Sequence, residues 1–166
     1  MPNEALFRSF LNTERIGREI FCPETTSSTM DFLKQRADDL SDGAAVICGE
    51  QTSGRGRRGR KWTSGKNQSL ALSFLLKTPR TRQISAVTLV CGLACANALN
   101  RLFGSGFGVK WPNDPIFSEK KIGGILCESI LSGDSCSIVC GIGINLTQDA
   151  QFFIDAGLPH AASILS

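Results

Sequence analysis

The 166-residue sequence lacks any run of about 18 uncharged apolar residues, so no membrane-spanning helix is expected. Residues 1–10 contain Glu4 and Arg8 and are not followed by an apolar stretch, which argues against a secretory signal. The sequence also lacks internal repeats and linkers, while its apolar content of 42% excludes a disordered chain. We therefore expect one domain over residues 1–166, located in the cytoplasm and away from membranes.

Histidine is nearly absent, and the use of cysteine is unusual. Seven cysteines are an odd number in a chain without an export signal, so reduced thiols are expected instead of a disulfide framework. The pairs Cys91/Cys95 and Cys136/Cys140 have C-x3-C spacing in apolar surroundings, and His160 is the single histidine. A structural zinc site is one alternative, but small buried core residues are the better interpretation of the cysteines.

Carboxylates are missing from residues 51–113, which contain 11 lysines and arginines. The flanking residues 1–50 (5 basic, 9 acidic) and 114–166 (2 basic, 6 acidic) each carry a charge of −4. Together with the +11 of the central segment, this gives a net charge of +3. A surface built from the central segment attracts anions. Five of its cations lie within seven residues: Arg55, Arg57, Arg58, Arg60 and Lys61.

Hydrophobic periodicity predicts an α+β fold with one mixed, largely antiparallel sheet and helices mainly on one face. One helix should follow the hydroxyl cluster at 25–29 and end at Gly43, and its apolar positions are Met30, Leu33, Ala37 and Leu40. A longer helix should end at Gly104, and one stripe of it consists of Ile84, Val87, Val90, Cys91, Ala94, Ala98 and Leu102. Strands are predicted at 15–22, 44–48, 70–76, 107–111, 122–130 and 138–146.

Residues 54–59 match the pattern G-x-G-x-x-G, but their context does not fit a dinucleotide-binding turn. No acidic residue follows before Asp114, and no Walker A sequence is present. The glycines let backbone N–H groups approach an anion, and the arginines can donate paired hydrogen bonds to phosphate or carboxylate. The segment is therefore either a solvated basic loop or an anion-binding loop, and we expect it to be mobile when empty.

Three further segments could carry chemistry. Residues 110–114 place an amide and a carboxylate together at a turn, where Asp114 could hold Mg²⁺ or a ligand hydroxyl. Residues 120–126 bring Lys121 into a strand whose glycines leave room for a ligand. Residues 141–145 form an apolar strand that ends in Asn145. Each segment alone could equally be an ordinary turn or strand end.

Together these segments resemble the catalytic domain of biotin protein ligases, which has a class II synthetase-like fold. The resemblance covers about residues 15–165 and rests on Ser28-Thr29, residues 51–62, 110–114, 121–126 and 141–145, in the order of the family. It implies that biotin reacts with Mg-ATP to form biotinyl-5′-AMP. It further implies transfer of biotin to a lysine of a biotin carboxyl carrier protein domain.

The resemblance also implies roles for individual residues. Lys121, as an electrostatic bridge between the reactants, and Arg57 would be catalytic, and Asp114 would hold Mg²⁺. Biotin would contact Ser28, Thr29, Gln51, Gly54, Arg55, Arg57, Lys121 and Gly124. ATP would contact Arg55, Arg57, Trp62, Asn113, Asp114, Lys121 and Asn145.

Two features differ from the family, and several alternatives stay open. No helix-turn-helix segment precedes the domain, and the sequence stops about 20 residues after Asn145, where relatives continue into a small β-barrel. The chain could thus be a truncated relative that binds biotin but transfers it weakly, or a lipoate ligase. A nucleic-acid-binding module would use residues 55–61 and Trp62 but would leave Lys121 and Asp114 without a role. We therefore expect no nucleic acid as a partner. An exposed sheet edge could pair two copies into a homodimer.

Overall fold

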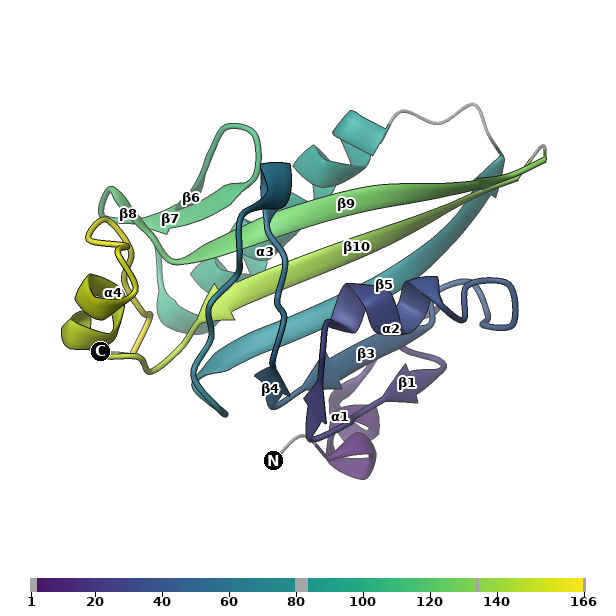
Figure 1. Ribbon diagram of the computed structural model, residues 1–166, viewed down its shortest axis with the longest axis horizontal. Coiled ribbons are helices and arrows are strands. Elements are labelled where there is room, and N and C mark those ends of the chain that lie inside the picture. Colours follow the sequence, from purple (N-terminus) through teal and green to yellow (C-terminus); the bar gives the residue numbers. More distant parts are fainter. Residues whose placement is uncertain (1–2, 80–83, 134, 166) are drawn as a thin grey trace.

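The computed structural model describes residues 3–79, 84–133 and 135–165. A five-stranded sheet of order β1-β3-β5-β10-β9 forms the centre of the molecule (Figure 1). Its strands are β1 (Ile20–Phe21), β3 (Ala45–Cys48), β5 (Ser69–Pro79), β10 (Ser135–Asn145) and β9 (Gly123–Ser132). β1 and β3 are parallel and the other pairs are antiparallel, which confirms the predicted α+β class with a mixed, largely antiparallel sheet.

Two small sheets accompany the main one, so the prediction of a single sheet was wrong. One pairs β2 (Thr25–Thr26) with β4 (Glu50–Gln51), and the other joins β6 (Phe107–Lys110), β7 (Asp114–Phe117) and β8 (Lys120–Lys121). The sequence did not predict β7, because it contains Pro115 and starts within a turn-like stretch. As a result, residues 110–114 lie beside the main sheet instead of inside it.

The helices lie mainly on one face of the main sheet. In Figure 1, α1 (Glu4–Phe10) and α3 (Ile84–Phe103) lie behind the sheet, while α2 (Thr29–Lys34) covers part of the front. The short 3-10 helix η1 (Arg57–Gly59) lies in front of β9, and α4 (Ala150–Asp155) lies beyond the end of β10. Neither α1 nor α4 was predicted from the apolar pattern.

The first predicted helix is shorter than expected but buries the expected residues. α2 ends at Lys34, and the chain continues in turns, yet Met30, Leu33, Ala37 and Leu40 all remain buried against the front of the sheet. Gly43 follows with φ +84, and a Cβ there would lie 2.2 Å from the carbonyl oxygen of Arg15. This position therefore requires glycine.

The buried face of α3 overlaps the predicted stripe only in part. Cys91 is buried as predicted, but Ala96 and Leu99 are buried outside the stripe, and within it Val90 is 65% and Leu102 is 74% exposed. The helix has apolar residues on all sides, so its periodicity does not identify the buried face. By length and composition alone, Ala86–Phe103 could cross a membrane, with a mean hydropathy of 1.4, but here one side of it contacts β9 and β6.

Candidate active site

A pocket of about 400 Å³ lies on the front face of the main sheet. Its floor includes Gly124 on β9 and Gly143 on β10, and residues 54–62, called the arginine loop below, form one wall. Eleven of the predicted site residues line it: Ser28, Thr29, Gln51, Arg55, Arg57, Trp62, Asn113, Asp114, Lys121, Gly124 and Asn145. Segments separated by more than 100 residues thus converge on one cavity.

Gly54 is the predicted site residue that does not line this pocket. It lies at the neck of the arginine loop, where its carbonyl oxygen accepts a 2.9 Å hydrogen bond from the backbone N–H of Trp62. A Cβ on Gly54 would lie 2.5 Å from the carbonyl oxygen of Trp62. Glycine is therefore needed here for the close approach of the two ends of the loop.

Trp62 lies against the glycine floor. A Cβ on Gly143 would be 2.6 Å from the indole ring, and one on Gly124 would be 3.5 Å from it. The indole nitrogen is buried and has no hydrogen-bond partner among the described residues. Because a buried donor without an acceptor is costly, this nitrogen points to a bound molecule that supplies an acceptor.

Several polar side chains, joined by hydrogen bonds, line the pocket near the start of α2. The Gln51 side-chain oxygen accepts hydrogen bonds from the backbone N–H of Thr29 at 2.9 Å and from its hydroxyl at 3.0 Å. The Thr29 hydroxyl also lies 2.8 Å from that of Ser73, and the Ser28 hydroxyl caps α2 at 3.4 Å from the N–H of Asp31. These bonds fix the orientation of several polar atoms before any ligand binds.

Charged and amide groups meet at the opposite side of the pocket. Lys121 Nζ lies 2.8 Å from Asp114 Oδ1, which also accepts a 3.1 Å hydrogen bond from the Asn113 amide. Arg57 donates to Asn113 Oδ1 at 2.8 Å. The two residues with predicted catalytic roles, Lys121 and Arg57, are therefore linked through the turn that carries Asn113 and Asp114.

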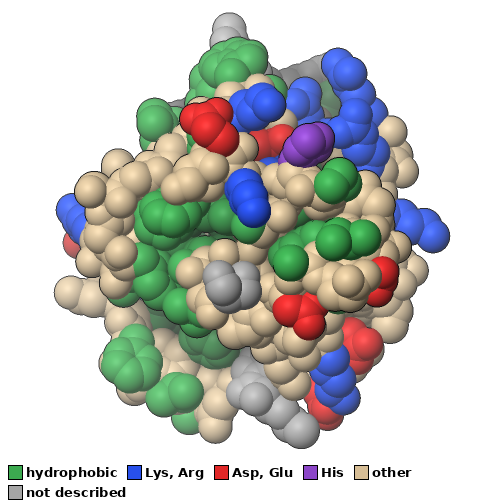
Figure 2. Space-filling view, turned by 90° about the vertical axis from the view of Figure 1, so that its left-hand side faces the viewer, with side chains coloured by type: hydrophobic (Ala, Val, Ile, Leu, Met, Phe, Trp, Pro, Cys, Tyr) green, Lys and Arg blue, Asp and Glu red, His purple; other side chains and the backbone are tan. Residues whose placement is uncertain are grey.

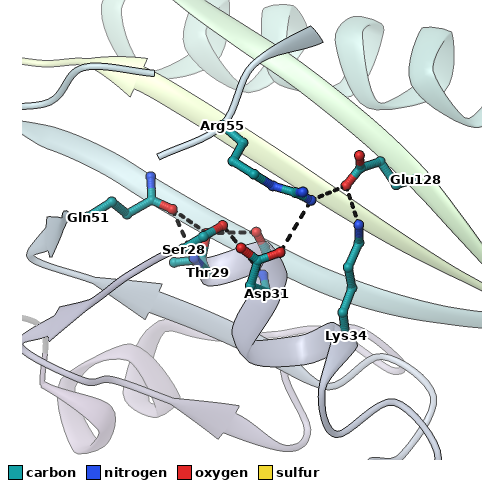
Figure 3. A network of polar contacts seen from close by, with 8 residues as sticks. Ser28, Thr29, Asp31, Lys34, Gln51, Arg55 and Glu128 are labelled. Carbon is teal, nitrogen blue, oxygen red and sulfur yellow. Dashed lines mark hydrogen bonds and ion pairs between the residues drawn. The ribbon is translucent and has the colours of Figure 1, made fainter. Parts of the chain in front are cut away.

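Arg55 belongs to an ion-pair network that joins the arginine loop to the main sheet (Figure 3). Its guanidinium contacts Glu128 on β9 and lies 3.3 Å from Asp31 on α2. Lys34 Nζ lies 2.5 Å from the same Glu128 carboxylate. Asp31 and Glu128 lie outside the acid-free segment, and sequence reasoning missed both as neighbours of the loop. Their only sequence signal is that each is close to a recognised motif.

The end of the chain completes the site, and this was also missed. Asn145 donates to the carbonyl oxygen of Ala162 at 3.0 Å, and the backbone of Lys121 bonds to those of His160 and Ala162 at 2.9 Å each. Leu158 and Ala161 line the pocket. Figure 2 shows the end of the molecule that carries α4, with lysine and arginine side chains gathered toward the upper right. No sequence motif marks this segment.

A family model described as the biotin/lipoate A/B protein ligase family matches residues 22–145. The chain belongs to this family. Two relatives in the family are bifunctional ligase/repressor BirA proteins. That of Bacillus spizizenii is 32% identical over 162 residues, which cover 92% of this chain and 48% of that protein. That of Escherichia coli is 40% identical over 122 residues, which cover 72% of this chain and 38% of that protein.

A solved structure has the same arrangement of the chain. The biotin protein ligase of Aquifex aeolicus, in complex with biotin and ATP, superposes with a TM-score of 0.69 and is 39% identical. The match covers 79% of this chain and 53% of that one. This ligase-family chain therefore spans about half the length, or less, of the curated relatives it matches, and it retains the fold that surrounds the pocket.

Proposed function

We propose that this ligase-family chain activates biotin with ATP to biotinyl-5′-AMP and transfers biotin to a lysine of a biotin carboxyl carrier domain. The observation that carries the proposal is the meeting of Lys121 with the arginine loop in one pocket. The A. aeolicus relative supports the two substrates, because its structure is a complex with biotin and ATP. Relatives named biotin-protein ligases support the reaction class.

The charges in the pocket suit this reaction. The biotin carboxylate and the triphosphate are both anions, so they repel one another unless cations lie between them. Lys121, Arg57 and the neighbouring arginines of the loop supply those cations. In the proposed reaction a carboxylate oxygen of biotin bonds to the α-phosphorus, and pyrophosphate leaves with the electrons of the bond that breaks. Lys121 stabilises the charge that develops on the phosphoryl oxygens.

The polar residues near α2 suit the uncharged end of biotin. Its ureido ring offers both donors and acceptors, which match the fixed hydroxyl and amide groups of Ser28, Thr29 and Gln51. The unpaired indole nitrogen of Trp62 would find its acceptor on the nucleotide. The arginine loop would cover the mixed anhydride, which hydrolyses when water reaches it.

One carboxylate fits the Mg²⁺ that accompanies ATP. Asp114 is the single acidic residue among the described residues that line the pocket, and one of its oxygens already contacts Lys121. Mg²⁺ is commonly held by one or two carboxylates together with substrate phosphates and waters, so a single Asp is sufficient. The ion would supply further neutralisation of the phosphate charge.

The test is incubation of the purified chain with labelled biotin, Mg-ATP and a biotin carboxyl carrier domain. Biotinyl-5′-AMP and biotinylated carrier are measured separately. Formation of both supports the proposal, and adenylate without transfer indicates a biotin-activating relative that lacks the transfer step. Adenylation of lipoate in preference to biotin, in a competition between the two acids, would overturn the assignment.

A nucleic-acid-binding module would behave differently in a binding assay. It would bind oligonucleotides with an affinity that falls steeply with salt, and biotin would not change that affinity. Such a result, together with no adenylate, would also overturn the proposal.

A further inference from the structure

Three cysteines meet behind the main sheet, on the face opposite the ligand pocket. Cys91 comes from α3, while Cys127 and Cys140 lie directly opposite one another on β9 and β10. Their sulfur atoms all lie within 4.8 Å of one another. The cluster thus contains one cysteine of each C-x3-C pair, Cys91 and Cys140, together with Cys127, which belongs to neither pair.

The cluster lies within the hydrophobic core and is reduced. Cys91 is 6% exposed and Cys140 is fully buried, and both belong to a core cluster that includes Ile125 and Ile138. Cys127, the third member, is partly exposed. All seven cysteines are free thiols, so these three sulfurs are available as ligands.

The three thiols are not equivalent. Hydrogen bonds from Cys140 and Cys91, and one from the Thr88 hydroxyl, lower the pKa of Cys127. The hydrogen bond to Cys127 is likewise the main reason that the pKa of Cys140 is raised. The three sulfurs are therefore already in mutual hydrogen-bond contact.

We propose that Cys91, Cys127 and Cys140 form a binding site for a soft, thiophilic cation, and specifically for Cu(I). Thiolates select soft ions such as Cu(I). Structural zinc takes four ligands, and within residues 3–79, 84–133 and 135–165 no histidine or carboxylate joins the three sulfurs. A set of three sulfurs in apolar surroundings instead suits a three-coordinate ion.

The geometry requires little movement. With a metal–sulfur distance of about 2.3 Å, as in zinc thiolates, three sulfurs in a plane around an ion lie about 4.0 Å apart. Sulfurs that lie within 4.8 Å of one another reach this arrangement by small side-chain rotations. Each thiol that becomes a thiolate ligand releases one proton to solvent, so binding weakens as the pH falls.

The first experiment titrates the reduced chain with Cu(I), without oxygen, against a coloured Cu(I) chelator of known affinity. We expect one equivalent of Cu(I) to be withdrawn from the chelator, and X-ray absorption to show three sulfurs at about 2.3 Å. Cys91→Ala, Cys127→Ala and Cys140→Ala should each abolish this endpoint. Cys95→Ala is the matched control, because Cys95 lies one turn from Cys91 on α3 but outside the cluster, and it should keep the endpoint.

A second measurement uses the unmodified sequence, in case a core substitution prevents folding. Cu(I) should protect Cys91, Cys127 and Cys140 from alkylation, as measured by mass spectrometry, and should leave the reactivity of Cys95 unchanged. The proposal is overturned if the chelator keeps all the Cu(I), if Cys95→Ala loses binding equally, or if zinc binds with four ligands instead. The result does not depend on ligase activity, because the cluster and the ligand pocket lie on opposite faces of the sheet.

Discussion

Lys121 and Asp114 form an ion pair inside the ligand pocket, with 2.8 Å between Nζ and Oδ1. The family resemblance implies that Lys121 contacts the reacting anions and that Asp114 holds a metal ion. In the structure, each instead neutralises the other. An incoming carboxylate or phosphate must therefore compete with Asp114 for the Lys121 ammonium group, and an incoming cation must compete with Lys121 for the carboxylate.

Replacement of Lys121 tests the centre of the proposed mechanism. Lys121→Ala is expected to slow formation of biotinyl-5′-AMP by about 10²–10³-fold, because it removes a group aimed at charge that develops in the transition state. Single-turnover assays with labelled ATP measure this step directly. The matched control is Lys120→Ala, which removes the exposed lysine next to Lys121 on β8 and should leave the rate unchanged. An unchanged rate in Lys121→Ala would remove Lys121 from the mechanism.

The network around Arg55 gives a prediction about the arginine loop. Glu128 accepts from both Arg55 and Lys34, so Glu128→Gln should release the loop from β9. Because partly exposed ion pairs contribute about 0.2–1 kcal/mol each, we expect trypsin to cleave within residues 55–61 about two- to fivefold faster. Timed proteolysis of the ligand-free chain, analysed by mass spectrometry, measures the rate.

A matched variant separates this network from a general loss of surface charge. Glu24 pairs with Lys66 at 3.1 Å, outside the pocket, so Glu24→Gln should not change cleavage in the loop. Biotin with ATP should slow cleavage in the unmodified chain if the loop closes over them. Equal cleavage rates for Glu128→Gln and the unmodified chain would show that the ion pair does not hold the loop.

The sequence predicted the members of the pocket better than their contacts. Lys121, Asp114 and the arginine loop belong to motifs of unusual composition, so they can be recognised without a structure. The carboxylates that neutralise Arg55 cannot, because Glu128 lies 73 positions away and is brought close only by the tertiary fold. The steric reason for Gly54 is likewise visible only in the fold, because it is the close approach of the Trp62 backbone that requires glycine there.

Secondary structure was predicted more reliably for the long strands than for the packing of α3. The alternation of residues 70–76 identified β5, and the apolar run at 138–146 identified β10. The buried face of α3 was found only in part, because that helix is apolar on all sides. The three-cysteine cluster is a consequence of the same packing. Its members come from α3, β9 and β10, and no spacing in the sequence indicates that they meet.

Because glycines form the floor of the pocket, we expect a single methyl group added there to reduce activity. Gly143→Ala places a Cβ 2.6 Å from the Trp62 indole, so the ring must move away from β10. A displacement of about 1 Å can cost up to 10²-fold in rate, and we expect adenylate formation to fall by at least about 10-fold. Gly108→Ala is the control, because its Cβ would meet only a side-chain atom of Ile116 at 3.8 Å. Similar activity of the two variants would contradict the proposed role of Trp62.

The last prediction concerns acid stability and an ion pair far from the pocket. Arg15 donates two hydrogen bonds to the Asp42 carboxylate, which also accepts from the backbone N–H of Lys77. The hydrogen bonds from Arg15 are the main reason that the pKa of Asp42 lies below its usual value of 3.8. Asp42→Asn keeps a side-chain oxygen for Lys77 but removes the charge. Since both partners are more than a third exposed, the loss at pH 7 should be only about 0.5–1 kcal/mol.

The sign of the pH dependence follows from the direction of the shift. A carboxyl with a lowered pKa in the folded chain stabilises it fully above the pKa of the unfolded chain, and this stabilisation is lost as the pH falls through the folded value. The free energies of unfolding of Asp42→Asn and the unmodified chain should therefore differ at pH 7 and approach one another as the pH falls below 3.8, the usual pKa of an aspartate. Urea unfolding at a series of pH values between pH 2.5 and pH 7 measures both curves. Asp39→Asn removes an exposed carboxylate from the same segment and should lack this pattern, and a difference that persisted at low pH would show that the charge of Asp42 is not its cause.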